Sequence, residues 1–426
     1  MKHSTIDRNM VSRRQFVQRT TTGLALPLII SSKVLGGRGK PGANERIRIG
    51  VIGVGNRSNL LIGQLPEGAE IVAVADCFLK RAEESAAKRQ ADWRIYQDYR
   101  RLLEQRDIDG VILGTPDHGR VQCAIQACQA GKDVYAEKPL TVCVDEGRAL
   151  VRAVRKHGRV FQVGSQQRSM AMNRVACDFV RNGGLGRVQF VLGVNYTGPY
   201  RFTDLPKEPV PEGLDWDMWL GPTEMRPYSP KLQFEWMRWR DYSGGEMTNW
   251  GAHGLDQVQW ALGMDGTGPV EFWPLAEGPK GSLAFRYKNG ITVRLEMPSG
   301  DLSGGAIFVG EKGRIEIVRN DCRTDPPRMI KELPPTEEVQ KWNSGQWQAK
   351  YHMQEWLDCL RTRKTPSADV EIGHRSVSIC HLANITRELN RRLKWDPEAE
   401  RFLGDEEANA MLSRPRRKGF ELPGPI

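Results

Sequence analysis

The chain has 426 residues, which is too long for one ordinary core and fits an N-terminal segment followed by two domains. Its apolar fraction of 39% supplies enough apolar surface for real cores, so the composition excludes a wholly disordered protein. The formal net charge is +10, but six basic residues and one acidic residue lie in the first 35 residues, which leaves +5 for the remainder. This local excess does not indicate a nucleic-acid partner, and we predict none.

Two other patterns in the sequence bear on surface and metal chemistry. The one compact basic cluster, Arg414 to Lys418, follows the acidic stretch 405–407, and we interpret it as a solvated face. The eight cysteines show no CxxC pair and lie mostly in apolar or helical surroundings, so we predict free core thiols. No spacing typical of metal ligands occurs, and we predict no metal site.

The first 45 residues resemble a twin-arginine export signal and its linker. Residues 12–18 read Ser-Arg-Arg-Gln-Phe-Val-Gln and precede an apolar run over 23–30. This run is well short of the roughly 20 residues that span a bilayer, so we predict no permanent membrane span. We predict a signal segment over 1–35, a linker over 36–45 and a periplasmic or otherwise exported protein. Such a signal implies that the protein is exported folded, with a cofactor that must then stay bound.

A glycine turn follows the first predicted strand, 47–52. Gly53 and Gly55 stand where a G-x-G-x-x-G turn needs them, and Ser58 replaces the third glycine. Gly53 allows the tight turn, and Gly55 lets the backbone approach a pyrophosphate at a helix N-terminus. The next predicted strand, 70–75, ends at Asp76, where an acid is expected to meet the adenosine ribose. We therefore predict NAD as the cofactor, with NADP as the alternative because Arg81 lies nearby.

Strand and helix patterns alternate after this point. We predict strands over 109–113, 133–136 and 160–163, and helices over 118–130 and 143–157. This alternation predicts an α/β fold with a parallel Rossmann sheet over 46–165. Two of the strands end in polar segments, Thr-Pro-Asp-His at 115–118 and Glu-Lys-Pro at 137–139. Ligands bind at this edge of such sheets.

The glycine turn, the Thr-Pro-x-His segment and the Glu-Lys-Pro segment, in this order and spacing, resemble the glucose-fructose oxidoreductase/inositol dehydrogenase (Gfo/Idh/MocA) family. The resemblance covers about residues 46–420. It implies that Thr115, Pro116 and His118 line the nicotinamide ribose, that Glu137 holds this ribose and that Lys138 reaches both nicotinamide and substrate. The predicted cofactor site comprises Gly53, Gly55, Asn56, Arg57, Asp76, Thr115, Pro116, His118, Glu137 and Lys138.

Residues 166–426 are predicted to form a second, α+β domain that binds the substrate. The Lys-Asn-Gly turn at 288–290 separates two alternating runs, 282–287 and 291–297, and predicts a hairpin. Residues 307–309 and 314–318 resemble a second hairpin. The family implies a large, mostly antiparallel sheet whose open face pairs subunits, so we expect a homo-oligomer, a dimer or a tetramer.

The polar segment 241–256 carries the predicted chemistry of the second domain. A Gly-Gly turn at 244–245 leads into a predicted helix on which Asn249, His253 and Asp256 share one face. A histidine there takes a proton from a sugar hydroxyl while hydride leaves the carbon. The family often has an aspartate where this chain has Asn249. Either His253 works with a weaker partner, or proton transfer falls to Lys138 or Tyr242.

The predicted catalytic residues are Lys138, Tyr242, Asn249 and His253. The predicted substrate-binding residues are Lys138, Arg168, Tyr242, His253 and Asp256. The leading hypothesis is an NAD(P)-dependent oxidoreductase that acts on a secondary alcohol of a sugar or polyol. The first alternative is a redox-neutral glycosidase or epimerase that acts on a glycoside or sugar through a transient keto-sugar. The second alternative is a non-catalytic sugar-binding protein, which Asn249 would favour.

Overall fold

The computed structural model describes residues 45–298, 302, 304–342 and 348–422. The predicted export signal, and the predicted linker apart from residue 45, lie outside these residues. In the described part of the chain, no helix is both long and apolar enough to cross a membrane.

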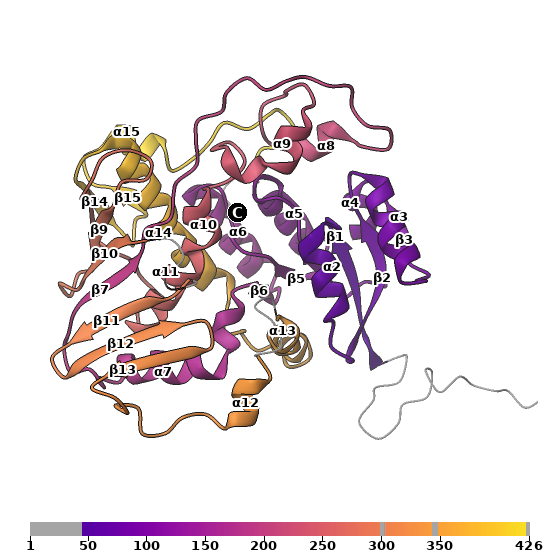
Figure 1. The fold of residues 1–426 in the computed structure, drawn as a ribbon. Coiled ribbons are helices and arrows are strands. Elements are labelled where there is room, and N and C mark those ends of the chain that lie inside the picture. The colour runs from indigo at the N-terminus through magenta and orange to yellow at the C-terminus, as the bar shows by residue number, and fades with distance from the viewer. Residues whose placement is uncertain (1–44, 299–301, 303, 343–347, 423–426) are drawn as a thin grey trace, which may run out of the picture. The chain divides into compact units, whose positions relative to one another are not determined.

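The first domain contains the predicted parallel sheet (Figure 1). Its strands are β1 (Ile47–Ile52), β2 (Ala69–Ala75), β3 (Arg94–Tyr96), β4 (Gly110–Leu113), β5 (Asp133–Ala136) and β6 (Phe161–Val163), in the order β3-β2-β1-β4-β5-β6. All five strand pairs are parallel. The strand order reverses between β1 and β4, so a ligand crevice is expected at their carboxyl ends. The connecting helices are α2 (Asn56–Gly63), α3 (Leu79–Lys88), α4 (Tyr99–Leu103), α5 (Asp117–Gln129) and α6 (Val144–Lys156).

The core of this domain also draws on a segment from far along the chain. Strands β4 and β5 are buried at every position, which requires cover on both faces of the sheet. Helix α13 (Lys350–Thr362) supplies part of this cover, because Trp356 packs against Tyr135 of β5 and belongs to the same apolar cluster as Ile49 of β1. The Rossmann core therefore extends beyond the boundary predicted at residue 165.

The second domain has a nine-stranded mixed sheet, mostly antiparallel as predicted. The sheet order is β13-β12-β11-β7-β10-β9-β8-β14-β15, and among the described strands only β7 and β10 pair in parallel. The strands are β7 (Val188–Val194), β8 (Glu271–Pro274), β9 (Leu283–Arg286), β10 (Thr292–Met297), β11 (Ala306–Gly310), β12 (Gly313–Val318), β13 (Asp321–Asp325), β14 (Leu393–Asp396) and β15 (Arg401–Phe402). Both predicted hairpins are confirmed, as β9–β10 and β11–β12.

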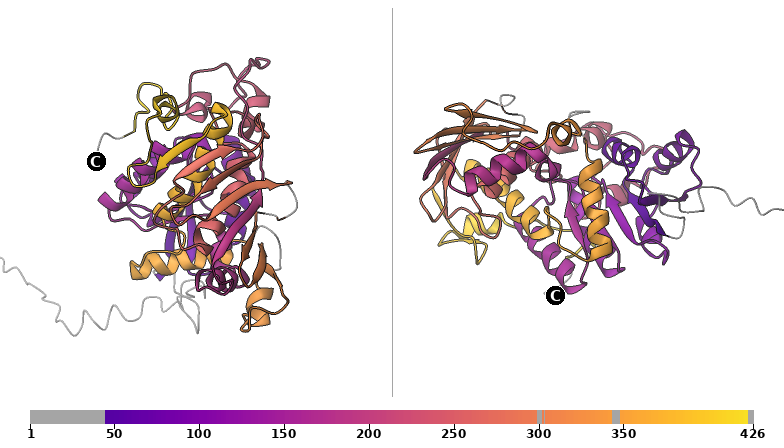
Figure 2. Two further views of the ribbon diagram at one scale, coloured as in Figure 1. Left: turned by 90° about the vertical axis from the view of Figure 1, so that its left-hand side faces the viewer. Right: turned by 90° about the horizontal axis from the view of Figure 1, so that it is seen from below.

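Helices cover one face of this sheet. Helices α7 (Ala171–Arg181), α11 (Gly251–Ala261) and α14 (Val370–Leu389) contact its strands, and α14 also contacts α6 of the first domain (Figure 2). Strand β10 shows why the sheet is two-sided: Val293 and Leu295 are buried, whereas Arg294 and Glu296 are exposed. The remaining described helices are α8 (Trp216–Leu220), α9 (Pro230–Phe234), α10 (Glu246–Asn249), α12 (Thr336–Gln340) and α15 (Glu406–Ala410), with short 3₁₀ turns at Gln166–Ser169 and Trp236–Arg238.

Candidate active site

A cleft of about 910 Å³ lies at the carboxyl ends of the Rossmann strands. Its inner wall combines the glycine turn, the end of β2 and both polar segments that follow β4 and β5. This volume suits a dinucleotide together with a small substrate. The cleft is lined by the predicted residues Gly53, Gly55, Asn56, Arg57, Asp76, Thr115, Pro116, His118, Glu137, Lys138 and Asn249.

The glycine turn fits a pyrophosphate. Gly53 has a φ of 78°, and a Cβ added there would lie 2.9 Å from the Thr115 backbone nitrogen. A Cβ added to Gly55 would meet nothing within 4 Å, so the backbone is open to a ligand at this point. Helix α2 starts here with neither a side-chain cap nor an acidic residue in its first turn. Its first backbone N–H groups and the positive end of its dipole therefore face the cleft.

Asp76 joins the end of β2 to this turn. Its buried carboxylate accepts hydrogen bonds from the backbone N–H groups of Val54 at 2.7 Å and Phe78 at 2.9 Å. Burial raises the pKa of Asp76, while Arg81, 3.8 Å away, acts in the opposite direction. Asp76 therefore shapes the glycine turn in addition to facing the cleft.

The two polar segments leave one hydroxyl unused. Thr115 Oγ1 is buried and has no hydrogen-bond partner among the described residues, as expected for a group that meets a ligand. Glu137 accepts a hydrogen bond from Arg57 Nε at 2.7 Å. The carboxylate is thereby held in place beside Lys138, whose backbone N–H also donates to it.

Lys138 and Asn249 meet across the two domains. Lys138 Nζ donates to the Asn249 side-chain oxygen at 2.8 Å and to the Asn249 backbone oxygen at 3.1 Å. The Asn249 amide nitrogen in turn donates to Glu246 at 3.1 Å, which fixes the orientation of the amide. Burial lowers the pKa of Lys138 to about 8, although the nearby carboxylates of Glu137 and Asp117 favour the charged form. The Lys138 amine is therefore suited to exchanging a proton near neutral pH.

His253, a predicted catalytic residue, is buried and does not line the cleft. Burial, reinforced by the positive charges of Lys138, Arg319 and Arg57, lowers the pKa of His253 well below its usual value of 6.5. The imidazole is therefore neutral at physiological pH. Among the described residues it has no hydrogen-bond partner, and its ring packs 6.1 Å from that of Trp250. Asn249 thus orients Lys138, not His253 as the sequence suggested.

The predicted polar helix face is only partly correct. The segment forms two helices, α10 and α11, which are separated at Trp250. Asp256 is buried and accepts hydrogen bonds from Arg168 Nε at 3.0 and 2.8 Å and from Ser376 at 2.7 Å. Arg168 also pairs with Asp265. Neither Arg168 nor Asp256 lines the cleft, so the structure gives both a packing role in place of the predicted substrate contact.

Tyr242 and His118 belong to an aromatic cluster. Tyr242 is fully buried, and its hydroxyl accepts a hydrogen bond from Arg226 at 3.3 Å. It does not line the cleft, so the predicted catalytic role is not supported. His118 packs edge-on against Tyr242, and its Nε2 lies 2.7 Å from the Trp219 carbonyl oxygen. Burial lowers the pKa of His118 to about 3, so this ring is neutral and ties α5 to α8.

The outer wall of the cleft is built from residues that the sequence did not single out as cofactor contacts. Segment 214–239, which contains α8 and α9, contributes Met218, Trp219, Phe234, Trp236 and Met237. Gln166 also lines the cleft, and its buried side-chain oxygen has no partner among the described residues. An orphaned amide in a cleft is the signal that identifies it, and this signal requires the fold.

The C-terminal arginine cluster is tied into the fold, which corrects the interpretation of a solvated face, and Arg417 fastens the outer wall. Arg414 and Arg416 both pair with the buried Glu146 of α6, and Arg414 also donates to the His118 backbone oxygen at 2.7 Å. Arg417 donates to the Gly221 backbone oxygen at 2.9 and 2.6 Å and pairs with Asp217 of α8. The side chains of these three arginines are at most 17% exposed.

Two family profiles match the chain over both domains. The profile described as "Oxidoreductase family, NAD-binding Rossmann fold" matches residues 47–165, and "Oxidoreductase family, C-terminal alpha/beta domain" matches residues 188–422. The chain belongs to the Gfo/Idh/MocA family of oxidoreductases. This membership establishes the cofactor class as a nicotinamide dinucleotide, consistent with the geometry of the glycine turn.

The relatives of this Gfo/Idh/MocA protein include inositol dehydrogenases. The chain is 26% identical over 172 residues to the inositol 2-dehydrogenase of Salmonella paratyphi B. This alignment covers 39% of this chain and 50% of that protein. It is 33% identical over 129 residues to the scyllo-inositol 2-dehydrogenase (NAD(+)) of Bacillus subtilis, covering 29% of this chain and 37% of that one. The matches span at most half the length of these relatives.

The fold resembles that of solved dehydrogenases over most of the chain. The WlbA dehydrogenase of Bordetella pertussis, in complex with NADH and UDP-GlcNAcA, superposes with a TM-score of 0.59 at 21% identity. The alignment covers 82% of this chain and 99% of that structure. At this identity the likeness establishes the fold alone.

Proposed function

We propose that this protein transfers hydride between a bound NAD and a secondary alcohol of a sugar or polyol, and that Lys138 exchanges the hydroxyl proton. The observation that carries this proposal is the pairing of Lys138 Nζ with Asn249 in the dinucleotide cleft. The names of the inositol dehydrogenase relatives support the substrate class.

The residues divide the work as follows. A bound nicotinamide supplies the hydride acceptor or donor. The protonated Lys138 amine has three N–H donors, of which two bind Asn249, so the third can face a substrate hydroxyl. When the amine is neutral, its lone pair accepts the proton from that hydroxyl as the carbinol is oxidised. We assign no substrate contact to the buried, neutral His253, because it does not line the cleft.

A redox-neutral variant of this chemistry is the second candidate. We propose it because Arg417 fastens the outer wall of the cleft, an arrangement that favours a cofactor retained between turnovers. Oxidation of one carbinol to a ketone acidifies the neighbouring C–H, so a base can eliminate a glycosidic oxygen before the hydride returns. Cleavage of an aryl glycoside without a lasting change in nicotinamide absorbance would identify this variant.

We also propose that the protein is exported by the twin-arginine route and, as the open sheet face expected of the family implies, assembles as a homo-oligomer. The export proposal rests on the Arg-Arg motif at 13–14 and the apolar run that follows it. Replacement of both arginines by lysine should abolish delivery of the protein to the periplasm of a host that has this pathway. Delivery of both forms in equal amounts would refute the proposal.

The decisive test is to screen candidate substrates with protein that has been purified together with its bound nucleotide. The purified protein should release a nicotinamide dinucleotide on denaturation, and one of a panel of inositols, aldoses and glycosides should change the redox state of the bound nicotinamide. A protein that neither carries nor binds a nicotinamide would refute the proposal and favour the non-catalytic alternative. Lys138→Met should stop the reaction while Lys394→Met, an exposed lysine on β14, should not.

A further inference from the structure

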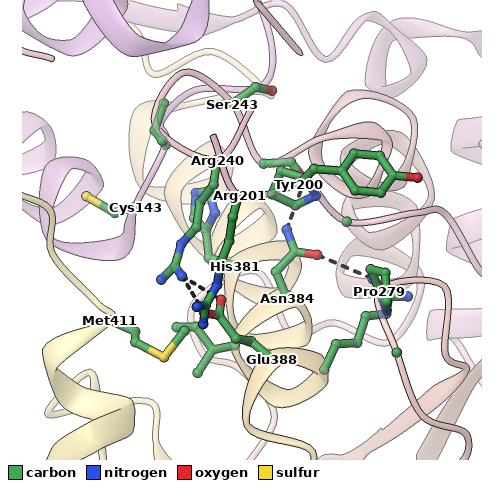
Figure 3. Close-up of a pocket in the computed structure, with 17 residues that line it drawn as sticks. Cys143, Tyr200, Arg201, Arg240, Ser243, Pro279, His381, Asn384, Glu388 and Met411 are labelled. Atoms are coloured by element: carbon green, nitrogen blue, oxygen red, sulfur yellow. Dashed lines mark hydrogen bonds and ion pairs between the residues drawn. The ribbon is translucent and has the colours of Figure 1, made fainter. Parts of the chain in front are cut away.

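A second cavity, of about 350 Å³, lies apart from the dinucleotide cleft, and none of the described residues lines both. Its floor is one face of α14, on which His381, Asn384 and Glu388 follow each other at helical spacing. Its rim is formed by the segments around Tyr200 and Pro279 (Figure 3). The volume lies in the range of small-molecule sites.

The charges of this cavity do not balance. Arg201 and Arg240 both pair with Glu388, at 2.8 and 2.6 Å, and Figure 3 shows their guanidinium groups converging on that carboxylate. Arg387 also lines the cavity and adds a third positive charge. Among the described lining residues Glu388 is the only acid. Burial lowers the pKa of His381 to about 4, so this residue is neutral. The three arginines and one glutamate therefore give the wall a formal charge of about +2.

Arg387 is the most unusual of these groups. It is only 6% exposed, yet it forms no ion pair with any carboxylate in the described part of the chain. Its guanidinium donates to the Gly281 backbone oxygen, to Asn384 Oδ1 and to Asn195 Oδ1, all of them neutral acceptors. A guanidinium has five N–H donors, so two have no such acceptor. A buried charge without a counterion is costly, and an anion in the cavity would remove this cost.

The described residues of the wall offer binding groups but no reactive ones. His381 Nε2 is engaged with Thr141 at 3.1 Å, and burial raises the pKa of the Cys143 thiol, so neither is available as a base or nucleophile. The lining also includes the Tyr200 ring, Ile385 and Met411, which suit a partly apolar ligand body. We infer that this cavity binds a small organic anion, one that carries a carboxylate or phosphate group, without transforming it.

The test uses NADH-saturated protein, because free phosphate would otherwise compete for the glycine turn. Succinate and inorganic phosphate are titrated by calorimetry and thermal denaturation, with succinamide and sodium chloride of equal ionic strength as controls. We expect saturable binding of at least one of the two anions and no saturable effect of either control. The two anions distinguish a carboxylate site from a phosphate site.

Two variants change the charge of the cavity in opposite directions. Arg240→Gln should weaken anion binding about ten-fold, and Glu388→Gln should strengthen it because it removes the internal competitor. Arg238→Gln, an exposed neighbour that does not line the cavity, should leave binding unchanged. NADH binding by each variant shows that it is folded. Absence of binding by both anions, or equal binding by all three variants, would overturn the inference, which does not depend on the proposed reaction.

Discussion

Lys138 Nζ lies 2.8 Å from the side-chain oxygen of Asn249, and this contact joins the end of β5 in the Rossmann domain to α10 in the second domain. An amide at this position orients the amine without adding a negative charge. A carboxylate would instead favour the protonated lysine. Burial keeps the pKa of Lys138 low enough for proton exchange, and asparagine, being uncharged, does not oppose this effect.

Lys138→Met should reduce turnover by about 10²-fold or more, because the variant cannot exchange the hydroxyl proton. NADH affinity should change little by comparison, since the glycine turn is unaltered. Steady-state rates and NADH fluorescence titrations separate the two effects, with Lys394→Met as the control. The assignment would be contradicted if Lys138→Met bound NADH poorly but turned over at the normal rate once NADH was bound.

Asp256→Asn should destabilise the fold instead of weakening substrate binding. The change removes a full charge from the partner of Arg168, whose side chain is 3% exposed, and we expect a loss of about 3 kcal/mol in the free energy of unfolding. Asp265→Asn should cost less, because this second partner is 29% exposed. Urea denaturation measures both. A raised KM with unchanged stability in Asp256→Asn would restore the predicted substrate contact.

Some parts of the molecule can be predicted from the sequence, and others cannot. Strands β1, β2, β4 and β5 and the turn at Gly53 were predictable because hydrophobic patterning and turn chemistry are local. The pairing of Asp256 with Arg168 was not, because the partners lie 88 residues apart. The same holds for the basic cluster, because Arg414 pairs with Glu146, which is 268 positions away. In the sequence, the nearby acids at 405–407 are the more obvious partners for these arginines.

Arg417→Ala should accelerate release of NADH. Arg417 holds segment 214–239 through the Gly221 backbone oxygen and Asp217. Loss of charge-assisted hydrogen bonds of this kind should shift the equilibrium toward an open position of this segment by about ten-fold. Stopped-flow displacement of bound NADH measures the rate. Lys418→Ala, the exposed next residue, is the matched control. Identical release rates in the two variants would show that the cluster does not retain the cofactor.

Asp76→Ala should weaken NADH binding about ten-fold and reduce the preference for NADH over NADPH. The variant removes the acceptor of the Val54 N–H group in the glycine turn and leaves Arg81 without its carboxylate partner. Fluorescence titration with both nucleotides tests this, with the exposed Asp92→Ala as the control. A wild-type protein that prefers NADPH would contradict the NAD assignment.

The pH dependence of kcat/KM for alcohol oxidation, compared between the wild type and Asn249→Asp, tests the role of Lys138 most directly. Oxidation requires the neutral amine, so the wild-type rate should rise with pH and level off above about pH 8. The buried His253 should not contribute this limb, because burial keeps its pKa well below 6.5. In Asn249→Asp the new carboxylate raises the pKa of Lys138 and should move the limb upward by about 1 to 3 pH units. Identical profiles for the two proteins would contradict proton exchange by Lys138.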